Sequence, residues 1–337
     1  NEIEIGIILK KYVKDKKLLG IHRSCNVSKG KVQNMNKQHS CKIIEESSNL
    51  DNFVLLYSRF IDNVEAHDFM KKYNTINTIL VILDTLLSKI GKMQKFGIIH
   101  NDLHFGNILI ERKGDERNIN DMSMLTNNLK EFKNRIYVID FGLSIQQRKF
   151  MFDDKINYAY LKKICIGFDP SWKYSSLEYH FMSYLIFQGT VVTKKIVDKI
   201  VTIYVDNHPT LNILPASFID GYKKGAKRYY EKYVSMERDD IVKDALKYWK
   251  TWDIYHICVK FVSLFMEKDA RNYKFIMICL LGLHYNPEKR PNVHSFKQVL
   301  QKLVSQNFNN DLLRNTQIDI NNDELRNSSK SKLVQRA

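Results

Sequence analysis

Hydrophobic residues recur every three to four positions over residues 1–14, at the start of the chain. This spacing places one apolar face along a helix. Ile3, Ile5 and Ile7 also alternate as they would in a strand, but the helical spacing extends further and we favour a helix. The apolar face of this helix would contain Ile5, Ile8, Leu9 and Tyr12.

A second and longer stripe of hydrophobic residues runs from Asp68 onward. Its spacing is also helical, and Gly91 and Gly97 mark its fraying end. We therefore predict one long core helix across this region. Its apolar positions are Ile79, Leu83, Leu86, Ile90 and Met93.

Runs rich in β-branched and aromatic residues predict strands on either side of this helix. Before it, residues 18–27 and 52–61 form two such runs, separated by a polar loop from Ser28 to His39. After it, residues 98–110 have the pattern of short strands around a turn.

A further strand, over residues 136–140, is predicted to end at Asp140. The polar segment 112–134 before it has the composition of a surface loop. Residues 306–337 lack apolar periodicity, so we expect a disordered tail there.

The composition is that of a globular protein, with 337 residues of which 44% are hydrophobic. A net charge of +16 is compatible with an acidic partner, but Lys, Asn and Ile are abundant along the whole chain, which favours a solvated basic surface. The longest apolar runs are too short to span a bilayer, so we expect no membrane partner. The cysteines are odd in number and form no CxxC pair, which argues against a disulfide framework or a zinc site and favours a reducing compartment; they are Cys25, Cys41, Cys165, Cys258 and Cys279.

Two aspartates, Asp102 and Asp140, follow predicted strands, and Asn107 lies shortly after the first of them. Mg²⁺ prefers hard oxygen ligands, so a carboxylate and an amide oxygen together with phosphate oxygens form a suitable set. A second carboxylate can then orient an acceptor hydroxyl and take its proton. This arrangement is typical of phosphoryl transfer from a magnesium nucleotide.

At these positions the sequence resembles the protein-kinase family, which has an HxDxxxxN catalytic loop and a DFG motif. The resemblance implies ATP and Mg²⁺ as cofactors, Asp102 as the catalytic base, and Asn107 and Asp140 as the metal ligands. It also implies packing roles in the core for two motif residues, His100 and Phe141. The matching residues are His100, Asp102, Asn107, Asp140, Phe141 and Gly142.

Later segments resemble protein kinases more than small-molecule kinases of the aminoglycoside or choline type. In "KTWDIYHICVKFVSLF", Asp253 takes the place of the aspartate that braces the catalytic loop. "YSSLEYH" resembles the APE motif with Glu178 as its acid, and "YNPEKRPNVHSFKQVL" supplies Arg290 as the expected partner of Glu178 in a buried pair. Taken singly, Glu178 and Arg290 could be surface charges and Asp253 a helix cap, but their joint order favours the kinase interpretation.

The sequence also departs from the family, because no Gly-rich loop or VAIK-like strand precedes the catalytic loop. One explanation is that "GIILK" is a degenerate form of that strand, with Lys10 anchoring the phosphates. The other is that "NEIEIGIILKKY" already corresponds to helix C, with Glu4 or Glu2 as its acid and the first three strands upstream. We prefer the second explanation because the helical spacing is strong.

Two residues of the catalytic loop are also unusual. Asn101 replaces the Arg that binds the activation-loop phosphate in many kinases, so we expect activity without phosphorylation between Gly142 and Glu178. His104 stands where Ser/Thr kinases usually carry Lys, although haspin-like kinases have a similar DLHxGN loop.

Residues 185–248 form an insertion relative to the family's usual short link. It contains a predicted helix at 194–205, a Pro-marked loop at 208–215, and the Tyr- and Lys-rich stretch 221–233. Basic residues interleaved with Tyr can grip nucleic acid. We favour an amphipathic helix with Tyr inward and Lys outward.

We therefore predict an α+β, protein-kinase-like two-lobe fold. Residues 1–60 would form a partial N-lobe, residues 61–305 a large and mainly helical C-lobe, and residues 306–337 the tail. The expected activity is transfer of the ATP γ-phosphate to Ser or Thr hydroxyls of a protein substrate; the alternatives are a small-molecule kinase and a catalytically weak pseudokinase scaffold. We expect an intracellular, cytoplasmic protein. Comparable AT-biased, insertion-rich kinases occur in large DNA viruses, which would extend that location to a virion or host cell.

Overall fold

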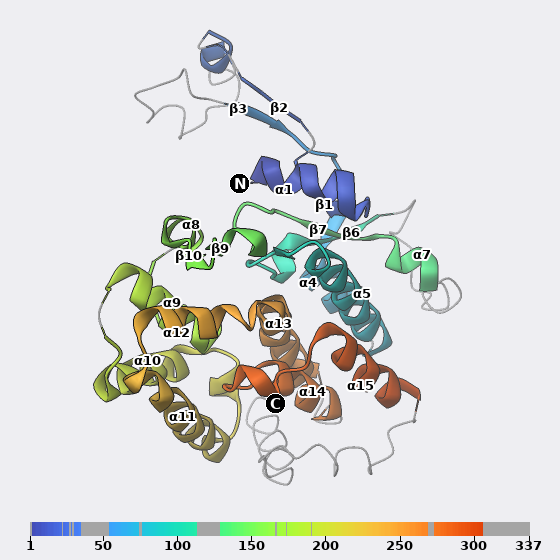
Figure 1. The fold of residues 1–337 in the computed structure, drawn as a ribbon. Coiled ribbons are helices and arrows are strands. Elements are labelled where there is room, and N and C mark those ends of the chain that lie inside the picture. Colours follow the sequence, from blue (N-terminus) through green and yellow to red (C-terminus); the bar gives the residue numbers. More distant parts are fainter. Residues whose placement is uncertain are drawn as a thin grey trace.

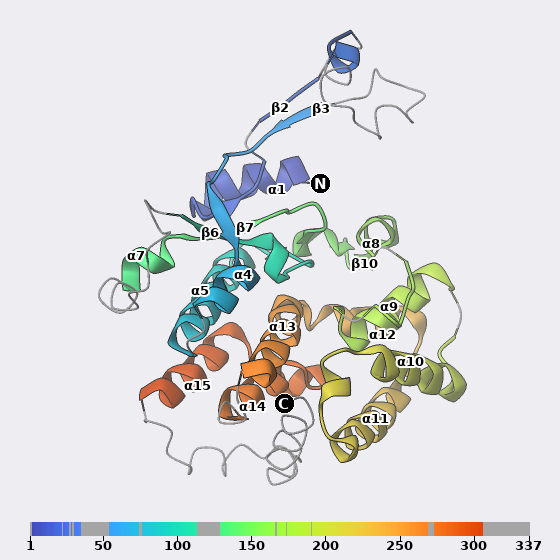
Figure 2. The same cartoon turned by 180° about the vertical axis from the view of Figure 1, so that it is seen from behind.

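The computed structural model describes most of the chain in separate ranges. These are residues 2–21, 23–26, 28, 30–34, 54–73, 76–112, 129–165, 167–172, 174–189, 191–268 and 273–305. Within them the fold is mixed α and β, mainly helical with small sheets, as the hydrophobic pattern predicted at the level of fold class. Figures 1 and 2 show β1, β6 and β7 near α1 and α4, and the helices from α9 onward below them.

The N-terminal segment is helical, as predicted. Helix α1 (Glu2–Ile8) continues directly into a π-helical turn, η1 (Leu9–Val13). The alternative in which "GIILK" is a strand is therefore wrong, and Lys10 lies on this helical segment with an exposed side chain. The apolar face of the segment is buried against the core through Ile5 and Leu9.

A four-stranded sheet lies beneath this helix. The predicted strand over 18–27 is interrupted, and only its first part joins the sheet. β1 runs parallel to β7, whereas the β7–β6 and β6–β4 pairs are antiparallel. The strands in order across the sheet are β1 (Leu18–Leu19), β7 (Ile136–Ile139), β6 (Ile108–Glu111) and β4 (Asn63–Glu65).

The second part of that predicted strand forms an antiparallel pair, β2 (Arg23–Asn26) with β3 (Val54–Tyr57). The predicted strand over 52–61 is thus shorter than expected in the described residues. In both views the pair projects away from α1 and from the rest of the molecule (Figures 1 and 2).

The long core helix predicted from Asp68 onward is instead two helices, α4 (Ala66–Lys72) and α5 (Ile76–Gln94). The prediction of one helix is wrong because the two segments pack on different partners. Helix α4 packs on β4, β6 and the 3-10 turn η2 (Phe105–Asn107), whereas α5 packs on α7, α13 and α15. A single straight helix could not reach both sets. The predicted stripe of α5 is nevertheless buried, with every member at most 1% exposed.

The polar segment 112–134 is not wholly a loop, because its end forms helix α7 (Leu129–Lys133). Phe132 is buried and its ring stacks on Phe69 of α4 at 5.5 Å between centroids. This aromatic contact turns the end of a polar segment into a packed element. Residues 113–128, and the tail predicted over 306–337, lie outside the described residues.

Helices form most of the remaining chain (Figure 1). Short strands and 3-10 turns connect them, including β5 (Ile98–Ile99), η2 (Phe105–Asn107), β8 (Ile145–Gln146), η4 (Gln147–Lys149), β9 (Met151–Phe152), β10 (Lys155–Ile156), η5 (Leu211–Ile213), η6 (Glu231–Ser235), η7 (Trp249–Thr251) and η9 (Pro287–Lys289). The helices are α8 (Tyr158–Ile164), α9 (Leu177–Phe187), α10 (Lys194–Asn207), α11 (Ala216–Tyr230), α12 (Arg238–Leu246), α13 (Trp252–Lys268), α14 (Tyr273–Gly282) and α15 (Val293–Ser305).

The insertion over 185–248 is built from α10, α11 and α12. The helix predicted at 194–205 is confirmed as α10. In and after α11, Tyr222, Tyr230 and Tyr233 are buried, which is the inward-facing tyrosine arrangement that we favoured over a nucleic-acid surface. No helix in the described part of the chain is both long and apolar enough to cross a bilayer.

Candidate functional site

The two motif-bearing segments lie side by side because short strands join them. β5 comes directly before His100 and pairs antiparallel with β8, which follows Gly142 shortly after the DFG motif. Ser144 Oγ donates a hydrogen bond to the His100 carbonyl at 3.2 Å, and Asn101 Nδ2 donates to the Leu143 carbonyl at 3.3 Å. The strand pair and these two hydrogen bonds place the HxD loop against the segment that begins with Asp140.

Asp253, in the first turn of α13, holds the backbone of the HxD loop. Its Oδ2 accepts a hydrogen bond from His100 N and its Oδ1 from Asn101 N, each at 2.9 Å. This is the contact that the resemblance to kinases led us to expect. The carboxyl is buried, and burial raises its pKa to about 6 although the two backbone donors oppose that rise. Asn101 itself has a left-handed φ of 63°, so the brace fixes a strained backbone position.

Asn107 is held by Asp102. Its Nδ2 donates to the Asp102 carbonyl at 2.9 Å and to Asp102 Oδ2 at 3.3 Å. Because the amide nitrogen is engaged there, the Oδ1 atom of Asn107 is the atom left to act as a metal ligand. Burial raises the pKa of the Asp102 carboxyl, His104 opposes this shift, and the neighbouring Asp140 carboxylate adds to it.

His104 lies near the same carboxylate, at a distance too long for a hydrogen bond. Its Nδ1 accepts a hydrogen bond from Gly106 N at 3.1 Å, which puts the ring proton on Nε2. Nε2 lies 3.7 Å from Asp102 Oδ2. This histidine stands where Ser/Thr kinases usually carry Lys and still presents a donor toward Asp102.

The DFG segment packs on the HxD loop through its aromatic residue. Phe141 is fully buried, with its ring centroid 4.9 Å from that of His100. His100 Nε2 donates to the Ile139 carbonyl at 2.9 Å, and burial lowers the pKa of this histidine to about 4. His100 is therefore neutral near pH 7 and has the packing role predicted for it.

Asp140 itself is exposed and has a left-handed φ of 59°. Its Oδ1 accepts a hydrogen bond from Gly142 N at 3.2 Å. Within the described ranges, no Lys or Arg forms an ion pair with this carboxylate. Asp140 thus presents an uncompensated negative charge toward solvent.

Negative charge accumulates around Asp140. Burial raises the pKa of Glu2 on α1, and the Asp140 carboxylate raises it further. Asp102 experiences the same repulsion from Asp140. The Asp140 carboxylate therefore repels one carboxyl group on each of two other elements, and a divalent cation bound at Asp140 would relieve that repulsion.

A protein-only metal cage is not formed at this position. The described residues contain no group of three or more His, Cys, Asp or Glu side chains that could hold a metal ion. Mg²⁺ in nucleotide sites is commonly held by one or two protein oxygens and by the phosphates. The pair Asn107 and Asp140 fits that mode.

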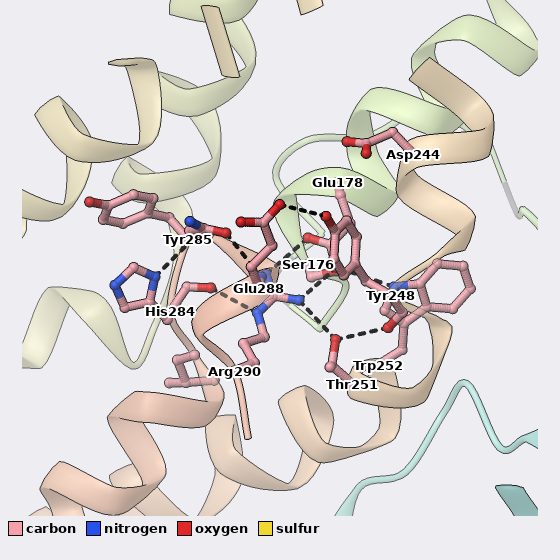
Figure 3. Close-up of polar contacts among 12 residues, drawn as sticks. Ser176, Glu178, Asp244, Tyr248, Thr251, Trp252, His284, Tyr285, Glu288 and Arg290 are labelled. Atoms are coloured by element: carbon pink, nitrogen blue, oxygen red, sulfur yellow. Dashed lines mark hydrogen bonds and ion pairs between the residues drawn. The ribbon is translucent and has the colours of Figure 1, made fainter. Parts of the chain in front are cut away.

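Glu178 and Arg290 form the buried pair that we expected from their order in the sequence (Figure 3). Arg290 donates from Nη1 to Glu178 Oε1 at 2.6 Å and from Nη2 to Oε2 at 2.9 Å, and neither side chain has exposed area. Further donors to this carboxylate are Ser176 Oγ, Trp252 Nε1 and the Tyr230 hydroxyl. The pair joins α9 to the segment before α15, and Trp252 at the start of α13 donates to the same carboxylate.

Glu4, a candidate for the helix C acid, is bound by cations from the segment after the DFG motif. Its Oε2 lies 2.5 Å from Lys149 Nζ, and its Oε1 lies 3.3 Å from Arg148 Nη2. Side-chain hydrogen bonding from Lys149 lowers the pKa of Glu4. Lys10 does not approach this site closely enough to form an ion pair in the described structure and is exposed.

A pocket of about 320 Å³ opens beside Asp102. Local sequence patterns did not identify its lining, because aromatic and small polar residues in an irregular segment carry no periodicity. Phe168 and Trp172 contribute aromatic surface, while Asp169 and His180 contribute polar groups. The full lining is Asn101, Asp102, Leu143, Gly167, Phe168, Asp169, Trp172, Ser175, Tyr179, His180 and Ser183.

Comparison with known proteins adds no relative. No protein-family model matches the chain, and no curated protein is significantly similar to it. The candidate site consequently rests on the motif residues and on the contacts described above.

Proposed function

We propose that this chain is a divergent protein kinase with a partial N-lobe and a large, mainly helical C-lobe, which transfers the γ-phosphate of ATP to Ser or Thr hydroxyls of proteins. The observation that supports this proposal best is the convergence of Asp102, Asn107 and Asp140 at one position. Asp253, far along the chain, fixes the loop that carries two of them. A chance occurrence of the motifs would not require this convergence.

In this proposal each residue of the site has one role. Asn107 Oδ1 and the Asp140 carboxylate hold Mg²⁺, which when bound neutralises the phosphate charge of ATP. Asp102 would accept a hydrogen bond from the acceptor hydroxyl and take its proton as the hydroxyl oxygen bonds to the γ-phosphorus. The bond from that phosphorus to the bridging oxygen of ATP breaks at the same time, and ADP leaves. The mutual repulsion of Asp102 and Asp140 favours the metal-bound state, because the cation removes it.

Two contacts made by the C-terminal helices favour a polypeptide as the phosphate acceptor. The Glu178–Arg290 pair and the Asp253 brace belong to the arrangement that the resemblance associates with protein substrates. The pocket beside Asp102 has room for a side chain next to the acceptor hydroxyl and carries aromatic surface to bind it.

A pseudokinase scaffold is a second candidate, and one observation favours it. Glu4 forms ion pairs with Arg148 and Lys149, so its carboxylate is already engaged by cations from the segment after the DFG motif. Phosphoryl transfer depends on positioning the phosphates from both sides. A site that holds them from one side would bind nucleotide weakly and transfer slowly.

The test compares the wild type with Asp102→Asn and Asp140→Asn across a Mg²⁺ titration. Transfer of radiolabelled phosphate from ATP is followed with casein and myelin basic protein, and in parallel with choline and an aminoglycoside. Loss of the base should lower the rate by about 10²- to 10⁴-fold, and loss of the metal ligand should also raise the Mg²⁺ concentration required. Asp220→Asn, an exposed charge-matched change on α11, should leave transfer unaltered.

Each result distinguishes the candidates. Full activity in both variants would show that the assigned residues do not carry the chemistry. Nucleotide binding without transfer favours the scaffold, and transfer to the small hydroxyl compounds alone favours a small-molecule kinase.

A further inference from the structure

A tyrosine at the start of α8 is held by the insertion. The Tyr158 hydroxyl donates a hydrogen bond to Asp239 Oδ1 at 2.6 Å. The guanidinium carbon of Arg238 lies 4.4 Å from the centroid of the Tyr158 ring, within the range of a cation–π interaction. Both partners lie in the first turn of α12, so the insertion contacts the segment that follows the DFG motif.

The same segment is anchored on its other sides to the catalytic loop and to the core. The Tyr160 hydroxyl accepts a hydrogen bond from Gln146 N at 2.7 Å, and Gln146 pairs in β8 with the strand that leads into His100. Leu161 and Ile164 are buried in the main hydrophobic core, where α8 contacts α9. Helix α8 thus connects the catalytic loop, α9 and α12.

The chain beyond α8 forms one wall of the pocket beside Asp102. Gly167, Phe168, Asp169 and Trp172 of this wall follow α8 after only a few residues. A shift of α8 would therefore move the wall relative to Asp102. The contacts of Tyr158 with Asp239 and Arg238 tie α8 to α12 and would oppose such a shift.

The HxD loop carries no arginine at position 101 that could bind a phosphate on the segment between Gly142 and Glu178. Asn101, in place of the usual Arg, uses its side-chain amide on the Leu143 carbonyl. A neutral amide cannot bind a phosphate on this segment as a guanidinium does. The wall itself is held by α9, because His180 Nε2 donates to the Trp172 carbonyl at 3.0 Å and the Phe168 ring packs on the Tyr184 ring. Helix α12 acts one step earlier, on α8, from which the wall continues.

We propose that Tyr158 is a positioning residue through which α12 sets the affinity of the pocket for the acceptor, so that the insertion replaces activation-segment phosphorylation in this protein. The proposal rests on the proposed function, since it assigns the pocket to the acceptor. In the described residues, neither Tyr158 nor Asp239 forms a hydrogen bond or ion pair with the proposed metal ligands Asn107 and Asp140. The contact should therefore act on acceptor binding and leave ATP binding unchanged.

The experiment uses the complete chain with casein as acceptor. Asp239→Ala and Tyr158→Phe each remove the hydrogen bond, and each should raise the KM for casein about fivefold, the ratio expected for one such bond at a partly exposed site. The KM for ATP and kcat should change less than twofold. Asp239→Asn keeps an acceptor oxygen and should restore most of the affinity.

The matched control is Asp240→Ala. Asp240 lies in the same first turn of α12 and is exposed, and it forms no hydrogen bond or ion pair with α8 in the described residues. Its loss therefore changes the helix-terminal charge equally. It should leave the KM for casein at the wild-type value. Hydrogen–deuterium exchange of residues 151–165 and 167–172 is measured in all variants, and only the Tyr158 and Asp239 variants should exchange faster.

Several outcomes would overturn the proposal: equal KM values for casein in Asp239→Ala and Asp240→Ala, a parallel rise in the KM for ATP, or a loss confined to kcat. If the wild type transfers no phosphate, the proposed function fails but the exchange measurement still decides. Equal exchange in Asp239→Ala and Asp240→Ala would show that the Tyr158–Asp239 contact does not hold α8. Faster exchange in Asp239→Ala than in Asp240→Ala would support that role.

Discussion

Removing Arg290 should be among the most destabilising single changes in this protein. Burial by itself would raise the pKa of Glu178, but Arg290 and the neighbouring donors hold it below the ordinary value. Arg290→Met would leave that carboxylate buried with only neutral donors, from Ser176, Trp252 and Tyr230. Breaking a buried pair from one side costs about 3–5 kcal/mol.

The upper part of that range applies because Arg290 also donates from Nε to the His284 carbonyl at 2.8 Å and from Nη1 to Thr251 Oγ1 at 3.3 Å (Figure 3). Each such hydrogen bond is worth about 0.5–1.5 kcal/mol, which places the loss in the upper part of the range for a broken buried pair rather than beyond it. We therefore expect Arg290→Met to lower the free energy of unfolding by about 4–5 kcal/mol. Such a loss is a large part of the total stability of a typical domain.

The assay is urea unfolding at 25 °C and pH 7, followed by circular dichroism. Glu178→Leu and the double variant complete a mutant cycle, in which the double variant should be more stable than the sum of the single losses predicts by about 3 kcal/mol. Lys223→Met is the control, because its pair with Asp206 at 2.9 Å is partly exposed and should be worth less than about 1 kcal/mol.

The reasoning would be refuted if Arg290→Met cost no more than Lys223→Met. Strict additivity of the single losses in the double variant would refute it as well. Either result would mean that the two side chains do not depend on each other in the folded protein.

Two further predictions concern the loop brace and the helix contact. The folded carboxyl of Asp253, with its pKa raised to about 6 from 3.8, binds a proton that the unfolded chain has released, so the free energy of unfolding falls by up to about 3 kcal/mol as the pH rises from about 4 to above 6. Asp253→Asn removes this dependence, so its destabilisation, measured by urea unfolding at several pH values, should be largest near pH 4 and shrink as the pH rises; a constant difference would contradict the assignment. At Gly6, an added Cβ would overlap the Ile21 carbonyl oxygen and lie 2.9 Å from its backbone nitrogen, so Gly6→Ala should cost about 1–3 kcal/mol. Gly221→Ala, in the open middle of α11, should instead stabilise by about 0.5–1 kcal/mol, and equal effects of the two alanines in thermal unfolding would exclude the close contact.

The sequence predicted best those elements whose burial follows a simple period. The first helix, α5 and α10 each have an apolar face that is buried in the structure. Predictions were wrong where packing divided a continuous pattern. The stripe from Asp68 is split into α4 and α5 because the two halves contact different partners, and the polar segment 112–134 ends in a helix because Phe132 packs on Phe69.

The candidate site was only partly visible in the chain. Asp102, Asn107 and Asp140 could be selected because their residue types and order match a known catalytic pattern. The pocket lining, with Phe168 and Trp172, could not, because these residues lie in an irregular segment without periodicity. The alternative that placed Lys10 on a strand was wrong, and the preferred helix is confirmed. Alternation and helical spacing coincide in "EIEIGII", and the burial of Ile5 and Leu9 favours the helix.

By itself the sequence determined the helices that carry a sustained apolar face, such as α5 and α10, and the side chains that can supply acid, amide and guanidinium groups. These properties depend on residues a few positions apart, whose spacing is written directly in the chain. Only the tertiary structure decided that Asp253 accepts hydrogen bonds from His100 and Asn101, and that Tyr158 donates to Asp239. Such contacts join residues that are distant in sequence, and they form because the buried faces of several helices must pack together at once, which no local pattern specifies.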